Sequence, residues 1–132
     1  MKKIPVALNL IMVAMVAMGA TTKTEAFDPK QLASFIGLKQ CPGCDLSEFD
    51  FSQFGSEIDF HKADLRKANL SKANFSTTNL RGAKLFRSNL RWAIFHKTDL
   101  RGADLTKTNS NLANMNLANL RGARLIYANL SK

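Results

Sequence analysis

Acidic residues are scarce in this 132-residue chain: ten Asp and Glu stand against nineteen Lys and Arg, and the formal net charge is +9. This scarcity argues against a protein that imitates the negative charge of DNA. The basic excess instead predicts contact with an acidic partner, an anionic surface or nucleic acid. A chain of this length is expected to form a single domain.

Long apolar runs are absent after residue 26, so the remaining sequence holds no segment that could span a membrane. The start of the chain differs. Two lysines precede the apolar run 4–20, and small residues stand at the −3 and −1 positions of a cut after Ala26. This layout predicts a secretory signal peptide at residues 1–26, with a cut after Ala20 as the alternative. The other interpretation is an uncleaved membrane anchor, which would be the only contact of the chain with a membrane.

The sequence has a period of five in place of such runs. From Phe60 to Leu130 a large apolar residue occupies every fifth position, except at Ser110, and from Leu65 on a small residue stands two positions before it. Asn or Asp usually lies between the two. A period of five fits neither the 3.6-residue period of a helix nor the two-residue period of a flat strand. It fits a short extended stretch with two inward residues, followed by a corner.

A period of twenty lies over the period of five, since "NLRGA" at 79–83 returns as "DLRGA" at 99–103 and as "NLRGA" at 119–123. Four pentads then make one turn of a four-sided coil, in which residues twenty apart stack at the strand spacing of roughly 4.7–4.9 Å. Two columns support this interpretation, one of asparagine alone and one of alternating charge, as cross-strand pairing favours. They are Asn69, Asn89, Asn109 and Asn129, and Asp64, Lys84, Asp104 and Arg124.

The pentads "ADLRK", "ANLSK", "ANFST" and "TNLRG" open a series that continues to a second "ANLSK" near the end of the chain. Over residues 44–132 this series resembles the A(D/N)LXX pattern of the pentapeptide repeat family. The resemblance implies an all-β solenoid, a right-handed quadrilateral β-helix, with the Leu, Phe and Ala positions inside.

Several positions depart from the pattern. Ser110 replaces a core leucine, which predicts a small void or a local bulge, and Ile94 stands where Asn or Asp is usual, so it should point outward. Near the start, Cys44, Phe49 and Phe54 occupy the small inward column. One residue is missing from the segment that follows Phe54, so the first coil should be wider and irregular.

Glycine follows arginine at three corners, as Gly82, Gly102 and Gly122, where it could supply a positive φ. Other corners carry residues such as Lys67 and Trp92. We therefore expect that a left-handed residue is not a general requirement of these turns.

Residues 27–43 should cover the N-terminal end of the coil, because a stacked structure must protect its open ends. Asp28 followed by Pro29 is typical of a helix start, with Asp as the N-cap and Pro at the first helical position. The segment "KQLASFIGLKQ" then predicts a short capping helix, in which the residues that face the first coil are Leu32, Phe35 and Ile36.

Cys41 and Cys44, in the motif "CPGC", are the only cysteines, and they lie where the capping helix meets the first coil. We expect a structural disulfide. A redox-sensing pair is the alternative, because this spacing can lower the pKa of a thiol, although no βαβ pattern surrounds it; free thiols and metal binding are further options. The stretch "CPGCDLS" also resembles exported pentapeptide repeat proteins of cyanobacteria, which implies the periplasm or the thylakoid lumen.

Patterns that support catalysis are missing as well. His61 and His96 fall in different columns on different sides of the coil, and the carboxylates are scattered. Neither a Gly-x-Ser-x-Gly turn nor a Gly-rich loop before a helix is present. We therefore expect a protein that is not an enzyme and that binds no metal or cofactor.

Two outward surfaces are candidates for partner binding. Arg81, Arg101 and Arg121 share one column, which is either a solvated corner or an anion-binding strip for an acidic protein or lipid headgroups. Exposed apolar residues gather mainly on the later coils, where such a cluster can mark an interface; they are Phe86, Trp92, Leu112, Leu117, Ile126 and Tyr127. The resemblance also implies that a second copy can cover the C-terminal coil, so a homodimer is a candidate assembly.

The sequence thus favours a non-enzymatic, exported scaffold whose rigid surface contacts an unidentified protein, which could be acidic. The alternative is a redox-responsive accessory protein in which Cys41 and Cys44 open or close the cap. A topoisomerase-binding DNA mimic, as some relatives are, conflicts with the basic charge and with the export signal. Export also argues against nucleic acid as a partner.

Overall fold

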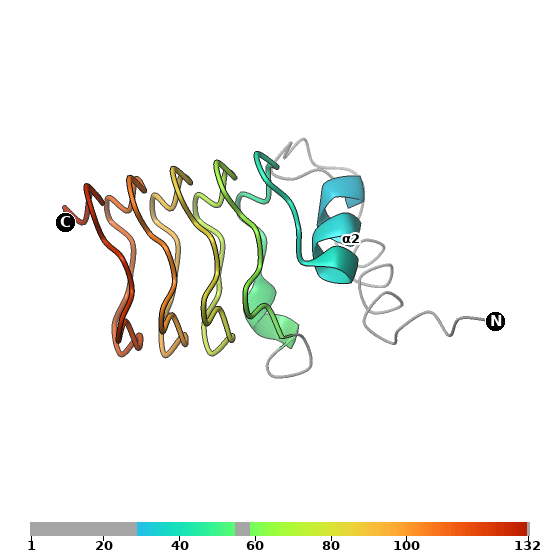
Figure 1. Cartoon of the computed structure of the whole chain (residues 1–132). Helices are drawn as coiled ribbons and strands as arrows, with labels where there is room; N and C mark the ends of the chain where they lie inside the picture. The colour runs from blue at the N-terminus through green and yellow to red at the C-terminus, as the bar shows by residue number, and fades with distance from the viewer. Residues whose placement is uncertain (1–28, 55–58, 132) are drawn as a thin grey trace.

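The computed structural model describes residues 29–54 and 59–131. The predicted signal peptide at 1–26, with its two alternative cut sites, and the predicted N-cap Asp28 lie outside the described residues. The described chain begins with helix α2 (Pro29–Leu38), passes through the 3-10 helix η1 (Phe51–Phe54) and then winds through regular coils. Figure 1 shows α2 against the N-terminal end of a rod made of these coils.

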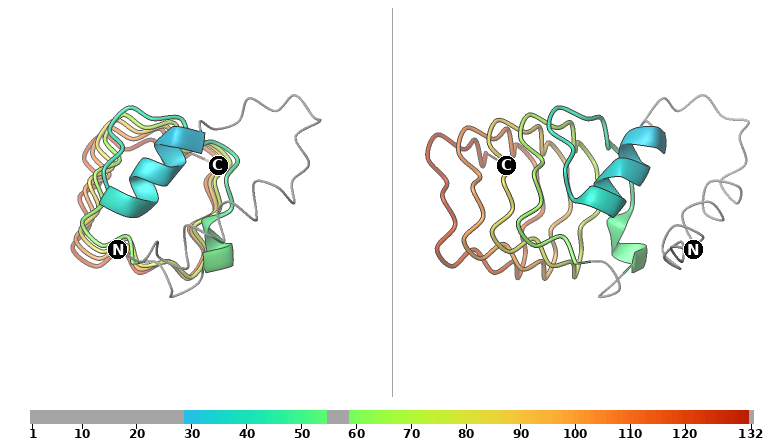
Figure 2. Two further views of the ribbon diagram at one scale, coloured as in Figure 1. Left: turned by 90° about the vertical axis from the view of Figure 1, so that its right-hand side faces the viewer. Right: turned by 45° about the vertical axis from the view of Figure 1, so that its right-hand side comes forward.

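Parallel β-bridges join each coil to the next. Asp59 pairs with Asn79, Asn79 with Asp99 and Asp99 with Asn119, and the other three sides repeat the spacing of twenty residues. Each side carries one bridging residue per coil. The described residues therefore form isolated bridges and not extended strands. Viewed along the rod, the coils superimpose as a four-sided outline (Figure 2). The predicted four-sided coil with twenty residues per turn is therefore confirmed.

Each regular corner is a four-residue turn closed by a backbone hydrogen bond. The N–H of Ala103 donates to the carbonyl oxygen of Leu100 at 3.0 Å, for example. The second corner residue has a positive φ at every regular corner of the described coils, including Lys67 (60°), Trp92 (58°) and Leu117 (58°). The expectation that these turns do not generally need a left-handed residue was wrong. A turn with this hydrogen bond and a positive φ at its third residue is of type II, and that geometry closes every regular corner.

The structure explains the preference for Asn or Asp before each corner. The side-chain oxygen of Asn79 accepts the backbone N–H of Arg81 at 3.1 Å, and Asp99 accepts that of Arg101 at the same distance. This bond from a side chain to the backbone two residues on is the Asx turn, which prepares the chain for the corner. Two members of the predicted asparagine column also pair through their side chains, since Asn89 Nδ2 donates to Asn69 Oδ1 at 3.1 Å.

The core consists of the large and small inward residues, most of which are fully buried. The rings of Phe51, Phe75 and Phe95 stack along the axis with centroids 4.4 and 5.5 Å apart. Helix α2 extends this core, because Phe35 is buried and its ring stacks on Phe60 at 5.0 Å. Ile36 is partly buried against the same cluster. The side chain of Leu32 lies outside the described residues.

The first coil is wider than the others and irregular, as predicted. It pairs with the second coil at an offset of twenty-four residues, as in Asp45 with Asn69 and Asp50 with Asn74, whereas later coils pair at twenty. The first coil is therefore four residues longer, and the prediction that one residue is missing was wrong. In a period of five, one missing residue and four additional residues shift the pattern by the same amount, so the sequence does not distinguish them. Cys44 and Phe49 are buried at their inward positions, and the side chain of Phe54 lies outside the described residues.

Ser110 keeps the backbone register despite its small size. Its N–H donates to the carbonyl oxygen of Asn129 at 2.8 Å, so no bulge forms. Its hydroxyl lies 3.1 Å from that of Thr108 inside the core. Ser110 also borders an open hollow of about 550 Å³ at the C-terminal end. Ile94 points outward as predicted, with 36% of its surface exposed.

Candidate functional surfaces

Cys41 and Cys44 form a disulfide across one corner of the first coil. They take the two inward positions that flank the corner, which Leu65 and Ala68 hold on the next coil. The Pro-Gly pair between them is well suited to a type II turn. Both cysteines are buried, and burial restricts the access of an exchanging thiol to the sulfur atoms.

Gln31 of helix α2 contacts this corner. Its side-chain oxygen accepts the backbone N–H of Asp45 at 2.8 Å, and its backbone carbonyl oxygen lies 3.6 Å from Cys41 Sγ. The disulfide, the first coil and the helix therefore meet at one point, as the position of the motif between helix and coil indicates.

Arg81, Arg101 and Arg121 are exposed and lie in one corner column. Together with the glycines that follow the last two, they line a shallow hollow of about 380 Å³. An adjoining hollow of about 490 Å³ continues past Lys62 to Asp59. Because glycine has no side chain, the guanidinium groups lie beside uncovered backbone. The structure thus brings the three arginines together on a surface that an anion could reach.

Arg101 is the arginine of this column that forms an ion pair in the described structure. Its guanidinium donates to both carboxylate oxygens of Asp99, with the shortest bond at 2.6 Å. These hydrogen bonds lower the pKa of Asp99, and the charge of Arg81 acts in the same direction. The charge of Arg101 is partly neutralised by Asp99. Arg81 and Arg121 are therefore more available than Arg101 to bind an anionic ligand.

The two histidines lie apart, as predicted. His61 is exposed, and its Nδ1 lies 2.5 Å from Asp59 Oδ2 and 3.4 Å from the Lys39 ammonium nitrogen. His96 sits at another corner. Neither is placed with a serine or cysteine in the described residues, and the pair of His61 with Asp59 is an exposed surface contact.

The predicted apolar residues occupy several corners and do not form one patch. Trp92 and Leu112 share a corner column, whereas Phe86 and Ile126 share another with Thr106 between them. Cations cover some of the rings: the guanidinium of Arg91 lies 4.0 Å from the Trp92 ring, and that of Arg87 lies 5.1 Å from the Phe86 ring. Such cation–π contacts shield an aromatic face from water. Leu117 and Tyr127 are the most exposed of the set.

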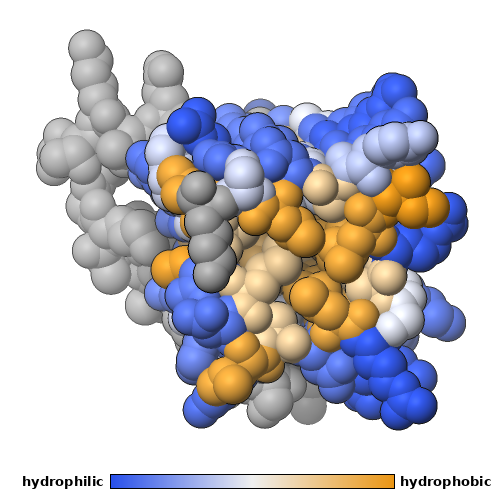
Figure 3. Space-filling view, turned by 90° about the vertical axis from the view of Figure 1, so that its left-hand side faces the viewer, coloured by the Kyte–Doolittle hydropathy of each residue, from blue (hydrophilic) through white to orange (hydrophobic). Residues whose placement is uncertain are grey.

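The C-terminal end of the described rod is apolar at its centre and polar at its rim (Figure 3). Its core residues are only partly covered, and Leu130 is 47% exposed. Along the rod, N–H groups such as that of Leu100 donate to the following coil. The corresponding groups of Leu120 and Gly122 have no backbone acceptor within residues 59–131. This end therefore presents an apolar surface together with an unpaired β edge.

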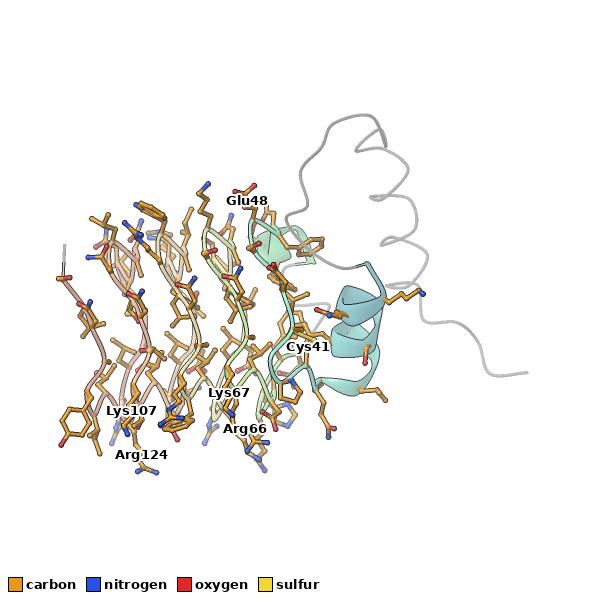
Figure 4. All side chains as sticks on the ribbon, turned by 90° about the horizontal axis from the view of Figure 1, so that it is seen from above. Cys41, Glu48, Arg66, Lys67, Lys107 and Arg124 are labelled. Atoms are coloured by element: carbon orange, nitrogen blue, oxygen red, sulfur yellow. A yellow bond between two sulfur atoms is a disulfide. The ribbon has the colours of Figure 1, made fainter. Side chains whose placement is uncertain are left out.

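A second column of cations was not predicted from the sequence. Lys67, Arg87 and Lys107 hold the second position of the next corner on successive coils. In Figure 4, Lys67 and Lys107 lie along one long edge of the rod, and Glu48 lies on the opposite edge. The twenty-residue spacing could have revealed this column, but these residues share no motif comparable to "LRG".

Two kinds of site were not found in residues 29–54 and 59–131. No group of three or more potential ligand side chains is arranged there to hold a metal ion. Within the same residues, no helix has the length and apolar character to cross a membrane.

Comparison with known proteins identifies the repeat. The family model "Pentapeptide repeats" matches residues 56–82, 83–115 and 100–132, with eight copies. The chain belongs to the pentapeptide repeat family. This assignment agrees with the side-by-side stacking of pentads described above, and members of the family with solved structures are right-handed quadrilateral β-helices.

Two solved structures resemble this pentapeptide repeat protein over much of its length. A pentapeptide repeat protein from the thylakoid lumen of Arabidopsis thaliana is 31% identical, with a TM-score of 0.57 over 76% of this chain and 66% of the other. One from Nostoc Pcc 7120 is 30% identical, with a TM-score of 0.58 over 67% of this chain and 71% of the other. The chain thus spans slightly less than two thirds of the Arabidopsis protein. No curated protein matches the sequence significantly.

Proposed function

We propose that this pentapeptide repeat protein is a non-enzymatic scaffold that holds a fixed array of outward side chains against a partner. The observation that carries the proposal is the bridge pattern, in which every regular side of a coil pairs with the next at a constant offset of twenty residues. The backbone holds outward residues in register, whereas the core depends only on the inward ones. Outward residues that take no part in the Asx turns can therefore be specialised for binding at little cost to the fold.

The scaffold acts in an exported compartment, the periplasm or the thylakoid lumen. Two observations support this location: the signal-peptide pattern at residues 1–26 and the similarity to a protein of the Arabidopsis thylakoid lumen. Detection of the processed N-terminus at Phe27 in the exported fraction of a host cell would test it. Retention of the complete chain in the cytoplasm would contradict it.

Helix α2 closes the N-terminal end of the scaffold, and a second copy of the chain covers the C-terminal end. The support for the second copy is the apolar centre of that end with its unpaired β edge, because both can be buried only by another chain segment. Sedimentation of the processed protein should show a dimer. The variant Ile126→Ser/Tyr127→Ser should shift it toward monomer, whereas Leu38→Ser, at an exposed position of α2, should not. A monomeric parent protein would overturn the dimer.

The column Arg81, Arg101 and Arg121 is the anion-binding strip of the scaffold. Its exposure and the uncovered backbone beside it support this role. The triple variant Arg81→Ser/Arg101→Ser/Arg121→Ser should keep its fold, because all three side chains are outside the core, and should lose binding to anionic partners at low salt. Unchanged binding would reduce the column to a solvated corner.

A redox-responsive role for Cys41 and Cys44 is the second candidate, and the disulfide at the contact between α2 and the first coil favours it. Burial of both cysteines favours a structural role instead. The reduction potential, measured by alkylation after equilibration in thiol buffers, separates the two. A value below about −300 mV marks a structural disulfide, and a value between about −120 and −270 mV marks an exchanging pair.

A further inference from the structure

The net charge of the described chain lies on one side of the rod. This basic side consists of one face of the coil with its two corners, residues 61–67, 81–87, 101–107 and 121–127. It holds two carboxylates, Asp64 and Asp104, and ten cations. The cations are Lys62, Arg66, Lys67, Arg81, Lys84, Arg87, Arg101, Lys107, Arg121 and Arg124. The basic side therefore carries a formal charge of +8, with histidine neutral.

The rest of the described chain carries no net charge. It has five cations and five carboxylates, so its formal charge is zero. They are Lys30, Lys39, Lys72, Arg91 and Lys97, and Asp45, Glu48, Asp50, Asp59 and Asp99. Figure 4 shows Arg66, Lys67, Lys107 and Arg124 along one edge of the rod and Glu48 on the other. Solubility alone would be served equally well by cations distributed over all four sides.

The fold does not require cations at these corners. The equivalent second corner position is held elsewhere by Thr77, Trp92 and Leu117 with the same positive φ. Stacked cations repel one another at the coil spacing of about 5 Å. Within the described residues, no carboxylate forms an ion pair with Lys67, Arg87 or Lys107, whereas Glu48 pairs with Lys72 on the other side. The unpaired column is thus a feature that binding, and not folding, explains.

The middle of the basic side is ionic and pairs within itself. Asp64 binds Arg66 through hydrogen bonds as short as 2.6 Å, and these bonds lower the pKa of Asp64, with a smaller effect from Lys84. Asp104 lies between Lys84 and Arg124 in the bridge column. A protein interface usually buries an apolar centre inside a polar rim. This side has the opposite arrangement, with exposed cations along both corners and no apolar centre.

We infer that the basic side lies flat against an anionic lipid surface. The two cation columns lie at the two corners of one side of the coil, and the coils stack one after another along the rod (Figure 1). Long lysine and arginine side chains can reach a layer of lipid headgroups that has no fixed register. Phe86 is half-buried at one of its corners, beside Arg87, where its ring can reach the headgroup region together with the cations. The inference rests on the proposed anion strip, extends it to the second corner and names its ligand.

Vesicle binding tests the inference on the processed protein purified from the exported compartment of a host. Phosphatidylcholine vesicles, with and without a one-third share of phosphatidylglycerol, offer the same hydrocarbon but differ in charge. The protein should bind the anionic vesicles alone, and salt should weaken the binding. The variant Lys67→Ser/Arg87→Ser/Lys107→Ser should lower the partition coefficient by about 100-fold, since each cation near an anionic surface contributes severalfold.

A matched control removes the same number of charges from the other sides. The variant Lys72→Ser/Arg91→Ser/Lys97→Ser should lower the partition coefficient by no more than about threefold, because those cations face away from the membrane. Thermal unfolding of both variants verifies that each is folded. An equal loss in both variants would show that net charge alone drives binding, and would overturn the assignment to one side.

Soluble poly-glutamate separates the lipid inference from the anion strip on which it rests. Binding of poly-glutamate without binding of anionic vesicles would overturn the lipid surface in favour of an acidic protein, and the anion strip would stand. Failure to bind either probe at low salt would overturn both. Binding of anionic vesicles that salt does not weaken would also contradict the inference, because it would show that charge is not the cause.

Discussion

The ring of Phe35 stacks on the ring of Phe60 with centroids 5.0 Å apart and an angle of 4° between the planes. Phe35 belongs to helix α2 and Phe60 to the first regular side of the β-helix, so this contact joins the two parts of the chain. It also begins the row of aromatic rings in the core, because Phe51 packs edge-on against both residues.

Phe35→Ala should destabilise the protein by about 3–5 kcal/mol, since it removes a fully buried ring and leaves a cavity under α2. Urea unfolding measures the loss. The control Leu38→Ala, at a position of the same helix that is 69% exposed, should change stability by less than about 0.5 kcal/mol. Similar losses in the two variants would mean that α2 is not docked through Phe35.

Gly102→Ala should destabilise the protein by about 1 kcal/mol. Gly102 has a φ of +66°, and an added Cβ would meet no atom within 4 Å, so the backbone conformation alone sets the cost. Gly37→Ala has equal space but lies in α2, where alanine is favoured, and should stabilise by up to about 1 kcal/mol. Thermal unfolding of the two variants should give shifts of opposite sign; shifts of the same sign would disprove the left-handed corner.

Cys41→Ala/Cys44→Ala should destabilise the processed protein by roughly 2 kcal/mol, which is the loop-closure estimate for so short a loop. The parent protein in reductant should approach the stability of the variant, whereas reductant should leave the variant unchanged. Unfolding curves with and without reductant measure both effects. A parent protein that is insensitive to reductant would contradict a stabilising disulfide.

The pair of Asp99 and Arg101 should make stability depend on pH. Hydrogen bonds from Arg101 lower the pKa of Asp99 in the folded state, so the pair stabilises above the unfolded pKa of about 3.9 and this contribution is lost as pH falls through the lower folded value. Asp99→Asn retains a side-chain oxygen for the Arg101 N–H, as Asn79 does for Arg81. The urea midpoints of parent and variant should differ at pH 7 and converge in acid. A constant difference would exclude the charge of Asp99 as its cause.

The regular coils were predictable because the period of five alone indicates whether each residue points inward or outward. Leu65, Leu85 and Leu105 are inward by the period of five, and they are fully buried. The corner conformation was predicted wrongly because the corners carry many residue types, which suggested that no single backbone conformation is needed. Lys67 and Gly82 nevertheless share a positive φ, although only glycine favours it. Backbone hydrogen bonds to the neighbouring coils impose the turn, so residues other than glycine adopt the positive φ despite its conformational cost.

The candidate surfaces were predictable only in part. The arginine column was visible because Arg81, Arg101 and Arg121 repeat one motif. The second cation column and the neutral charge of the other sides emerge once every residue is assigned to a side. The apolar residues were grouped by exposure, but Trp92 and Ile126 lie on different corners, and a patch depends on adjacency in space.

The sequence by itself determined the coil, its four sides and its inward residues, because periods of five and twenty specify burial and stacking without knowledge of distant contacts. The tertiary structure alone decided the offset of twenty-four in the first coil, the docking of Phe35 on Phe60 and the left-handed φ of every regular corner. The first two features arise where the period breaks, from pairing between segments far apart in the chain. The third is imposed by backbone pairing between coils, which a pattern of residue types does not record.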